Sequence, residues 1–528
     1  MKRKNNIFVR AGIIRLWRSA QYRFGSSGFR FKVEKSNSRT NFKVFYLITI
    51  FLFVSGLFFV SSCSNQKDLS LRYKIEKNFY ESEKMRKVLS INLKAAAPAD
   101  FKKVMQSYQE VMDLAATQSG VPLEKDISDI SASAELRIAE LYILQKDFDS
   151  AQRSLENVLR KYPESKNQGK NALLGLAQIY EKRNEKEKAV QTYHQLLDNY
   201  PAVMKKRLPD PDIFSVPNHL IQLFSPREEK ARRESEFEYV QKYFQNLIRT
   251  YPNTQVSFAA TLSLARAYQF QNLWEGSIVI LETAKDSTGQ TPGSVLLQVG
   301  NIYYDYLKDE KNSLLTFYRV IDSSPDSSSK AEAQMKIGMI YLQKKDYSRA
   351  KQELSRVKKL YPKENRLIAT SQYLIAQIYE KTTEWERALN EYNWLMVNYP
   401  LTSEGLESPL NIVAYYLKEN KVLAIESFEK GIKHYDQLLN KYKDKPFAIL
   451  IESQKAKLYT LQKEWDKAVS ILMKIAEKNP GTEAGLNSLL NLVRIYQQDL
   501  KDERKYKEIL ARIETEYPGI IPDTLFRR

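Results

Sequence analysis

The residues best suited to chemistry in this sequence are one cysteine, Cys63, and three histidines, His194, His219 and His434. So few of them leave no ligand set for a zinc or iron–sulfur site and no disulfide framework. The sequence also lacks a glycine-rich phosphate loop, an HExxH pair and a nucleophile elbow. We therefore expect no metal, no cofactor and no enzyme activity. The catalytic alternative is an unrecognised site in residues 203–235, whose only histidine is His219.

Positive charge is concentrated at the N-terminus. The formal net charge is +19 at pH 7, yet residues 1–62 hold twelve Lys and Arg against one acid, Glu34, which leaves +8 for the remainder. Strong positive charge can indicate a nucleic-acid partner. Here an apolar segment follows the basic arm and would hold it at a membrane, so we expect no nucleic-acid partner.

A secretory signal is predicted behind the basic arm. Residues 44–60, VFYLITIFLFVSGLFFV, contain no charge, and small residues follow them. A basic segment, an apolar segment and small residues before a cleavage point are the parts of a secretory signal. We assign residues 1–43 to a basic n-region or an unused upstream start, and residues 44–62 to the hydrophobic signal segment. The upstream Lys and Arg would keep the N-terminus inside and send the rest of the chain across the membrane.

The segment Val60-Ser61-Ser62-Cys63 resembles the lipobox of bacterial lipoproteins, in which the cysteine thiol receives diacylglycerol before cleavage. The resemblance implies acyl chains on Cys63 that fix the protein to the membrane of the bacterial cell envelope. By the same resemblance Ser64, rather than an acid, after that cysteine permits delivery to the outer membrane, and we expect the protein there, facing the periplasm. The alternative is an uncleaved signal anchor with an idle cysteine. Residues 63–84 are polar and charged and are predicted to form a linker.

The rest of the chain is a repeat with a period of about 37 to 40 residues. Its landmark is the dipeptide Tyr-Pro, and Pro325 and Pro480 take the same place after Ser and Asn. Each period contains two segments with apolar residues spaced by three and four, separated by a polar turn, which is typical of paired amphipathic helices. The proline ends the second helix because it lacks the N–H that a helix needs. The dipeptides begin at Tyr162, Tyr200, Tyr251, Tyr361, Tyr399 and Tyr517.

This pattern resembles the tetratricopeptide repeat, which places a small residue three positions before an aromatic in its first helix and Ala at the close crossing in its second. Gly338, Tyr341, Ala350 and Pro362 match it clearly. The resemblance implies an all-α fold, an α-solenoid of about nine helix pairs in a right-handed superhelix. We interpret the shared tyrosines as core packing beside small residues, where two helix axes approach closely. They are Tyr142, Tyr180, Tyr268, Tyr303, Tyr341, Tyr379, Tyr415, Tyr459 and Tyr496.

The landmarks also suggest boundaries along the array. Residues 131–202 are expected to form two repeat units and residues 236–528 the remaining ones. Residues 203–235 contain four prolines and are expected to be an inserted loop or a degenerate unit. Residues 85–130 include an amphipathic stretch at 101–116 and are predicted to be capping helices, because a solenoid unit buries its apolar face only against its neighbours.

The resemblance further implies a binding groove lined by the first helices. The residue after each small position, and the residue one turn later, are expected to face it. Most are polar or aromatic, which suits hydrogen bonding to a peptide backbone plus a few aromatic anchors. The alternative for each is ordinary hydrated surface. The predicted groove residues are Glu140, Gln178, Glu181, Arg266, Gln269, Asn301, Tyr304, Met339, Gln377, Glu380, Val413, Tyr416, Lys457, Arg494 and Gln497.

Together these features predict a lipid-anchored, exported, non-enzymatic scaffold that binds other envelope proteins or peptides. The lipobox and the YPES, YPLT and YPNT ends resemble the helical lipoprotein of the outer-membrane β-barrel assembly machinery and the periplasmic repeat protein associated with Tol-Pal. That resemblance implies a role in outer-membrane protein assembly or envelope coordination. The competing class is a lipid-anchored module that binds cell-wall polymer or anionic lipid, whose association would depend steeply on salt.

Overall fold

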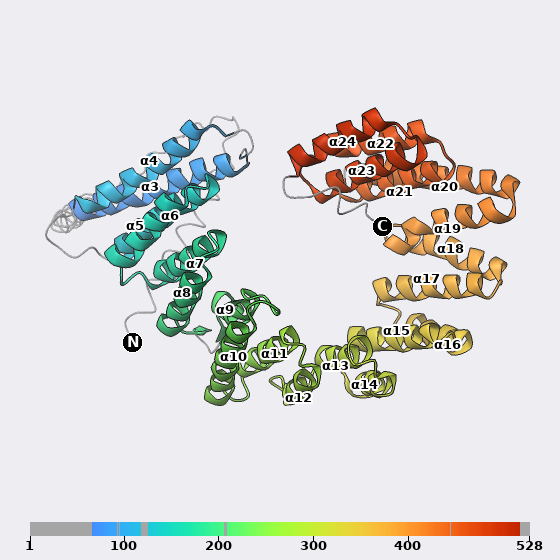
Figure 1. Cartoon of the computed structure of the whole chain (residues 1–528), viewed down its shortest axis with the longest axis horizontal. Coiled ribbons are helices and arrows are strands. Elements are labelled where there is room, and N and C mark those ends of the chain that lie inside the picture. Colours follow the sequence, from blue (N-terminus) through green and yellow to red (C-terminus); the bar gives the residue numbers. More distant parts are fainter. Residues whose placement is uncertain are drawn as a thin grey trace, which may run out of the picture. The chain divides into compact units, whose positions relative to one another are not determined.

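The computed structural model describes residues 66–91, 93, 96–117, 125–204, 208–443 and 445–517, and most of them are helical. Successive helices are joined by short turns into hairpins (Figure 1). The basic segment 1–43, the signal segment 44–62 and Cys63 lie outside the described residues. Within the described ranges, no helix combines the length and the hydropathy needed to cross a membrane.

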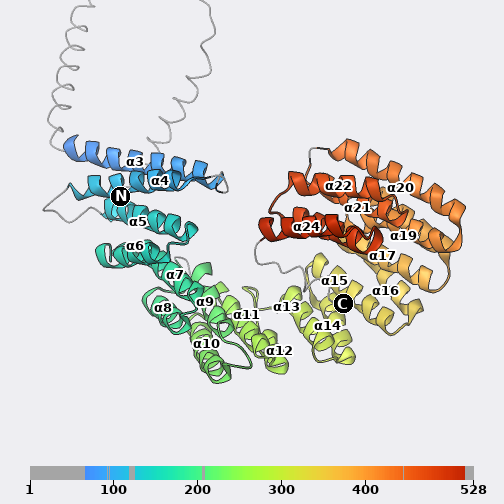
Figure 2. The same ribbon diagram turned by 45° about the horizontal axis from the view of Figure 1, so that its top comes forward.

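The chain divides into two compact units, residues 1–172 and 173–528. In the first unit α3 (Gln66–Ile91), α4 (Pro98–Ala116), α5 (Lys125–Leu144) and α6 (Phe148–Lys161) follow one another, and α3, α4 and α5 lie side by side (Figure 2). Their shared core contains Ile75, Tyr108 and Leu141. The Tyr108 hydroxyl donates to Glu83 Oε1 over 2.7 Å.

Part of the predicted linker is wrong. Residues 66–84, assigned to a polar spacer, belong to helix α3. Its buried or half-buried positions, Leu71, Ile75, Phe79 and Met85, recur at helical spacing and pack against the core of the first unit. Charged residues separate these apolar positions, so composition alone suggested a linker where the spacing supports a helix.

The remaining helices continue the series of pairs. The boundary between the two compact units falls within α7. A short antiparallel hairpin, in which Val203 lies opposite Pro209, precedes α9. The chain is therefore an all-α solenoid, as predicted. Its remaining elements are α7 (Lys166–Lys182), α8 (Lys186–Asn199), β1 (Val203–Met204), β2 (Leu208–Pro209), α9 (Pro211–Gln222), α10 (Lys230–Thr250), α11 (Gln255–Phe270), α12 (Trp274–Thr283), α13 (Gly293–Asp305), α14 (Glu310–Ser323), α15 (Ser327–Gln343), α16 (Tyr347–Leu360), α17 (Asn365–Lys381), α18 (Trp385–Asn398), α19 (Ser403–Glu419), α20 (Lys421–Tyr442), α21 (Phe447–Leu461), α22 (Trp465–Lys478), α23 (Glu483–Arg494), the π-helix η3 (Ile495–Asp499) and α24 (Glu503–Glu516).

The Tyr-Pro dipeptides mark the ends of second helices, as the sequence predicted. In each dipeptide the tyrosine is the C-cap residue, and the proline that follows cannot continue the helical hydrogen bonding. The helices that end this way are α6, α8, α10, α16, α18 and α24.

The turn inside a helix pair has its own conformational signature. A residue with a left-handed backbone precedes the N-cap of the second helix, as at Lys345, where φ is 60°. The next residue, Asp346, caps helix α16, because its carboxylate accepts a hydrogen bond from the backbone N–H of Arg349 over 3.1 Å. Such a cap satisfies a donor that the first helical turn otherwise leaves free.

Packing within a pair depends on small residues and on buried aromatics of the second helix. A Cβ added to Gly300 in α13 would lie 2.5 Å from the Phe317 ring of α14, so only glycine permits this approach. Ser313, also in α14, donates to the Gly300 carbonyl over 2.9 Å. The shared first-helix tyrosines are mostly half-buried, whereas Phe317 and Tyr392 of second helices are fully buried.

Residues 203–235 hold the β1–β2 hairpin, α9 and the start of α10. Asp210 caps α9, with Pro211 at the first helical position, where a missing N–H costs little. Arg233 of α10 is buried and donates to the carbonyls of Ile221 and Phe224, over 2.8 and 2.9 Å, at the end of α9. Burial lowers the pKa of this guanidinium. These contacts join α9 and α10 into a helix pair that departs from the repeat pattern.

Candidate binding site on the first helices

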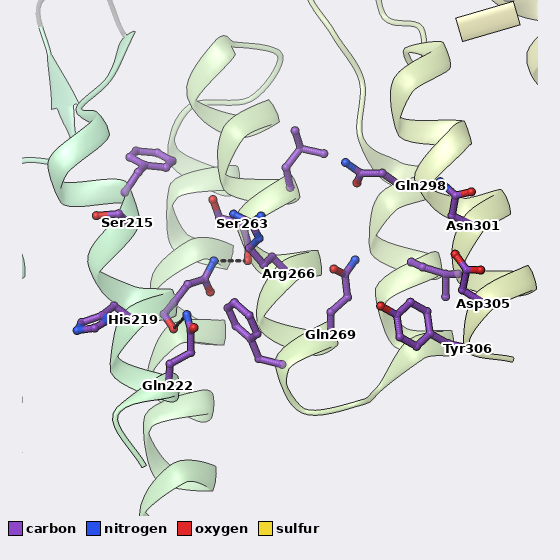
Figure 3. Close-up of a pocket in the computed structure, with 15 residues that line it drawn as sticks. Ser215, His219, Gln222, Ser263, Arg266, Gln269, Gln298, Asn301, Asp305 and Tyr306 are labelled. Carbon is purple, nitrogen blue, oxygen red and sulfur yellow. Dashed lines mark hydrogen bonds between the residues drawn. The ribbon is translucent and has the colours of Figure 1, made fainter. Parts of the chain in front are cut away.

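A pocket of about 800 Å³ lies on the face formed by α9, α11 and α13 (Figure 3). Three predicted groove residues, Arg266 and Gln269 of α11 and Asn301 of α13, come together in it. Because α11 and α13 are the first helices of neighbouring pairs, the pocket spans successive repeats. Its other lining residues are Phe214, Ser215, Asn218, His219, Gln222, Leu262, Ser263, Phe270, Gln298, Ile302, Asp305 and Tyr306.

Amides are the most frequent polar side chains in this pocket. Asn218 is buried and donates its Nδ2 to the Ser263 carbonyl over 2.9 Å. The side-chain oxygens of Asn218 and Asn301 are buried and have no hydrogen-bond partner among the described residues. Gln298 and Arg266 are exposed, and Arg266 forms no ion pair within the part of the chain that the structure describes. The exposed Gln298 amide can both donate and accept, and Arg266 donates, which is the combination that a peptide backbone requires.

One edge of the pocket is tied to α7 and α8. His219 Nε2 lies 2.8 Å from Glu181 Oε1, and the buried Tyr193 hydroxyl donates to the same oxygen over 2.5 Å. Burial, with the Glu181 carboxylate as the second cause, raises the pKa of Tyr193 above its ordinary value. Glu181, predicted to face a ligand, thus also joins three helices. The Ser215 hydroxyl donates to the Asp212 carbonyl over 2.9 Å, so it is not aligned with His219 as a nucleophile with its base.

A second pocket of about 410 Å³ lies on the same kind of face farther along the chain, between α19, α21 and α23. It brings together the predicted residues Lys457 and Arg494. Arg494 also lies 3.6 Å from the carboxylate of Asp499. Two separate parts of the second unit therefore have hollows lined by first helices.

Other predicted groove residues serve the packing of the helix pairs. Glu380 accepts a hydrogen bond from the buried Tyr392 hydroxyl over 3.1 Å. The Tyr416 ring meets the Trp385 ring edge-on, with centroids 5.4 Å apart. Tyr304 and Met339 are half-buried against apolar clusters.

The remaining predicted residues lie at the surface or partly below it. Gln178 and Gln497 are exposed, and Gln377 is half-buried. In the first unit Glu140 is exposed and pairs with Arg137 over 2.6 Å. These residues line none of the pockets described above.

The expectation for Val413 is wrong, because its side chain is fully buried. In α19 the residues that line the pocket are Leu410, Asn411 and Ala414. This is the pattern expected if Val413, rather than Ile412, occupies the small position. The assignment was one residue out of register, and in a helix one residue turns a side chain by about 100°.

Sequence reasoning missed a second row of lining residues. Ser263, Gln298, Asn411 and Asn491 each line a pocket and stand two positions before the small position of their helix, which valine fills in α19 and α23. The repeat spacing contained this signal, because positions two before and one after a given residue lie on one helix face. The contribution of α9 had no such signal, since its repeat landmarks are absent.

Within the described residues no group of three or more His, Cys, Asp or Glu is placed to hold a metal ion.

Comparison with known families agrees with the repeat geometry. The tetratricopeptide repeat family model matches residues 133–165, 171–202 and 332–364. The matched segments correspond to α5–α6, α7–α8 and α15–α16. Tetratricopeptide repeats are typical of scaffolds for protein–protein interaction. No curated protein matches the chain.

Solved structures with similarity to the chain include other repeat proteins. The C-terminal part of a tetratricopeptide repeat-containing protein from Cytophaga hutchinsonii is 16% identical, with a TM-score of 0.31, over 52% of this chain and 99% of that one. A tetratricopeptide repeat protein from Parabacteroides merdae is 13% identical, with a TM-score of 0.28, over 59% of this chain and 99% of that one.

Proposed function

We propose that this chain is a non-enzymatic tetratricopeptide scaffold that binds other proteins through its first helices, and that acyl chains on Cys63 anchor it in the bacterial cell envelope. The observation that carries the binding role is the pocket between α9, α11 and α13. Residues chosen from the repeat pattern alone, Arg266, Gln269 and Asn301, meet there around one hollow.

The spacing of the first helices favours an extended peptide as the ligand. Packed helices lie about 8–10 Å apart, and an extended chain advances about 3.3 Å per residue. A peptide crossing successive first helices therefore meets a new set of polar side chains roughly every third residue. Gln298 and Asn301 of α13, and Ser263 and Arg266 of α11, are the side chains in reach of such a backbone.

Photocrosslinking in intact cells tests this role. A photoreactive amino acid at Gln298, in the pocket, is expected to give adducts with specific proteins, and a second substitution, Arg266→Glu, should weaken them. The matched control is the same amino acid at Leu315, which is 58% exposed on second helix α14. If Gln298 gives no adducts beyond those at Leu315, the proposed binding face is wrong.

The identity of the adducts decides the finer role. We propose that the partners belong to outer-membrane protein assembly or envelope coordination, because the lipobox and the YPES-type ends resemble proteins with those roles. Adducts confined to cytoplasmic proteins would contradict this placement. The absence of catalysis is part of the same proposal, and an activity lost on His219→Ala would contradict it.

The anchor has a separate test. Cys63→Ala should abolish incorporation of a labelled fatty acid and block signal cleavage, because the modified thiol is absent. Unchanged labelling would exclude Cys63 as the lipidated residue. If the unchanged protein takes up no label and keeps residues 44–60, those residues are instead an uncleaved anchor.

A further inference from the structure

The outer face of α3 carries an amphipathic stripe that no described helix covers. We define the stripe as Tyr73, Lys77, Tyr80, Lys84, Lys87, Val88 and Ile91. Consecutive members are separated mostly by three or four residues, so they lie along one side of the helix. All seven are exposed, and Tyr73, Tyr80, Val88 and Ile91 are 64%, 60%, 60% and 74% exposed.

The stripe lies opposite the packed face of α3. That packed face includes Ile75, Ser82 and Leu89, which are buried, and α3 makes its contacts with α4 and α5. Two acids flank the stripe, and both are paired: Glu76 with Arg72 over 3.0 Å and Glu81 with Lys84 over 3.1 Å. Within the stripe itself the charged residues are all lysines.

An apolar hollow continues the stripe at the C-terminal end of α3. It has a volume of about 420 Å³ and lies between α3 and α4. Lys84 and Val88 belong to both features, and Lys103 stands on the α4 side. The walls are otherwise apolar: Met85, Leu89, Ala96 and Val104, with Asp100 as the acid at the rim.

We propose that this stripe docks on the surface of a lipid bilayer, with α3 lying in the plane of the membrane and its lysines on anionic headgroups. Tyrosine suits this position because its ring is apolar and its hydroxyl is polar, and lysine places its stem along apolar surface while its ammonium stays in water. A helix with such a face lies within the interface rather than across the membrane.

The position of α3 in the chain selects a membrane over other occupants. The helix begins at Gln66, three residues after Cys63. Three extended residues span about 10 Å, so acylation of Cys63 would hold the start of α3 against headgroups. This step rests on the proposed anchor. A helix of 26 residues is about 39 Å long, so the stripe would align a long side of the first unit with the bilayer.

Depth measurement on the full-length protein tests the proposal. The purified protein is reconstituted into vesicles of phosphatidylethanolamine and anionic phosphatidylglycerol, with an environment-sensitive fluorophore on Val88→Cys. We expect a blue shift and quenching by lipids that carry a nitroxide. The matched control is Val397→Cys, because Val397 is 78% exposed on α18 and lies outside the stripe. The fluorescence of the probe on Val397→Cys should be the same in vesicles with and without nitroxide lipid.

Charge removal provides a second readout. Each lysine near an anionic surface contributes roughly a fivefold preference for it. Lys84 is already paired with Glu81, so we substitute only the other two lysines: Lys77→Gln and Lys87→Gln together should lower the ratio of docked to undocked α3 by on the order of 25-fold. Both side chains are exposed, so the substitutions should leave the fold intact, as circular dichroism would verify. Raising the salt concentration should weaken docking of the unchanged protein as well.

Three outcomes would overturn the proposal. Equal quenching at positions 88 and 397 would mean that α3 does not face lipid. A blue shift at Val88→Cys without quenching by nitroxide lipid would assign the stripe to a protein partner or to a second copy of this chain. If the lysine substitutions leave the quenching unchanged, these lysines do not contact lipid headgroups. Mass spectrometry of the peptide containing Cys63 in the same sample shows separately whether the anchor itself has failed.

Discussion

Glu380 belongs to the predicted groove residues, yet its hydrogen bond joins the two helices of a pair, α17 and α18. Its carboxylate accepts from Tyr392, and burial raises its pKa. A raised carboxyl pKa means that the folded state favours the neutral form. The resulting stability is present at acid pH and is lost as the pH rises through the raised pKa. At neutral pH, therefore, the charged Glu380 carries a desolvation penalty.

We predict that Glu380→Gln raises the thermal unfolding midpoint at pH 7, by less than about 2 °C for a unit of this size. The amide oxygen can still accept from Tyr392, while the buried charge is gone. The difference should disappear below about pH 4, where the carboxyl of the unchanged protein is protonated. Differential scanning calorimetry from below pH 4 up to pH 7 measures it. Glu429→Gln, at an exposed position of α20, is the control. A gain independent of pH would contradict this account.

Gly405 in α19 is required by a close approach of two backbones. A Cβ built on it would lie 2.0 Å from the carbonyl oxygen of Tyr399, the residue that ends α18. Backbone atoms cannot move aside as a side chain can. We predict that Gly405→Ala destabilises the second unit by about 1–3 kcal/mol, measured by urea unfolding. In Gly431→Ala the new methyl would meet a flexible Leu458 side chain at 2.8 Å, and the loss should be smaller. Equal losses would argue against the backbone contact.

At the scale of elements, the sequence predicted the ends of the helices better than the backbone conformation of the turns between them. The proline after each C-cap is visible in the sequence because only proline removes a helical donor. The left-handed residue found inside most pairs had no comparable signal, since Lys146, Asn184 and Lys308 all adopt it without glycine. The groove register failed for a related reason. In α19 both Ile412 and Val413 are apolar and suit the same place, and packing decided between them.

The turn between α17 and α18 holds a β-branched threonine in the left-handed backbone region, where such a side chain is strained. Thr383 adopts a φ of 61°, whereas Asn184 and Asn272 hold the equivalent turns, with φ values of 59° and 58°. Asparagine tolerates the left-handed region better because its side chain is not branched at Cβ. We predict that Thr383→Asn stabilises the protein by about 1 kcal/mol, seen as a higher urea midpoint. Lys345→Asn should gain less, because lysine is not branched. A lower midpoint for Thr383→Asn would show that its hydroxyl bond to the Thr382 carbonyl, 2.6 Å long, outweighs the strain.

At the scale of the molecule, the repeat landmarks predicted the solenoid because packing there is local. Each buried cluster joins neighbouring helices, as the one around Phe317 joins α13, α14 and α15. The helices that the sequence did not place, α3 and α9, lie where those landmarks are absent, and the packing of α9 includes contacts that the sequence does not indicate. Arg233 is an example, since nothing in its sequence context indicates that it bonds the end of α9.

Local packing also predicts local unfolding. Phe317 is fully buried, and truncation of such a side chain costs about 3–5 kcal/mol. In a solenoid this loss should act mainly on the damaged repeat and its neighbours. Hydrogen exchange of Phe317→Ala should therefore rise in α13, α14 and α15. It should stay unchanged in α22, α23 and α24, whose buried residues form a separate cluster. Leu315→Ala, at an exposed position of the same helix, should alter neither region. Equal acceleration through α24 would mean that the second unit unfolds as one cooperative body, and stability would then be shared along the array rather than held repeat by repeat.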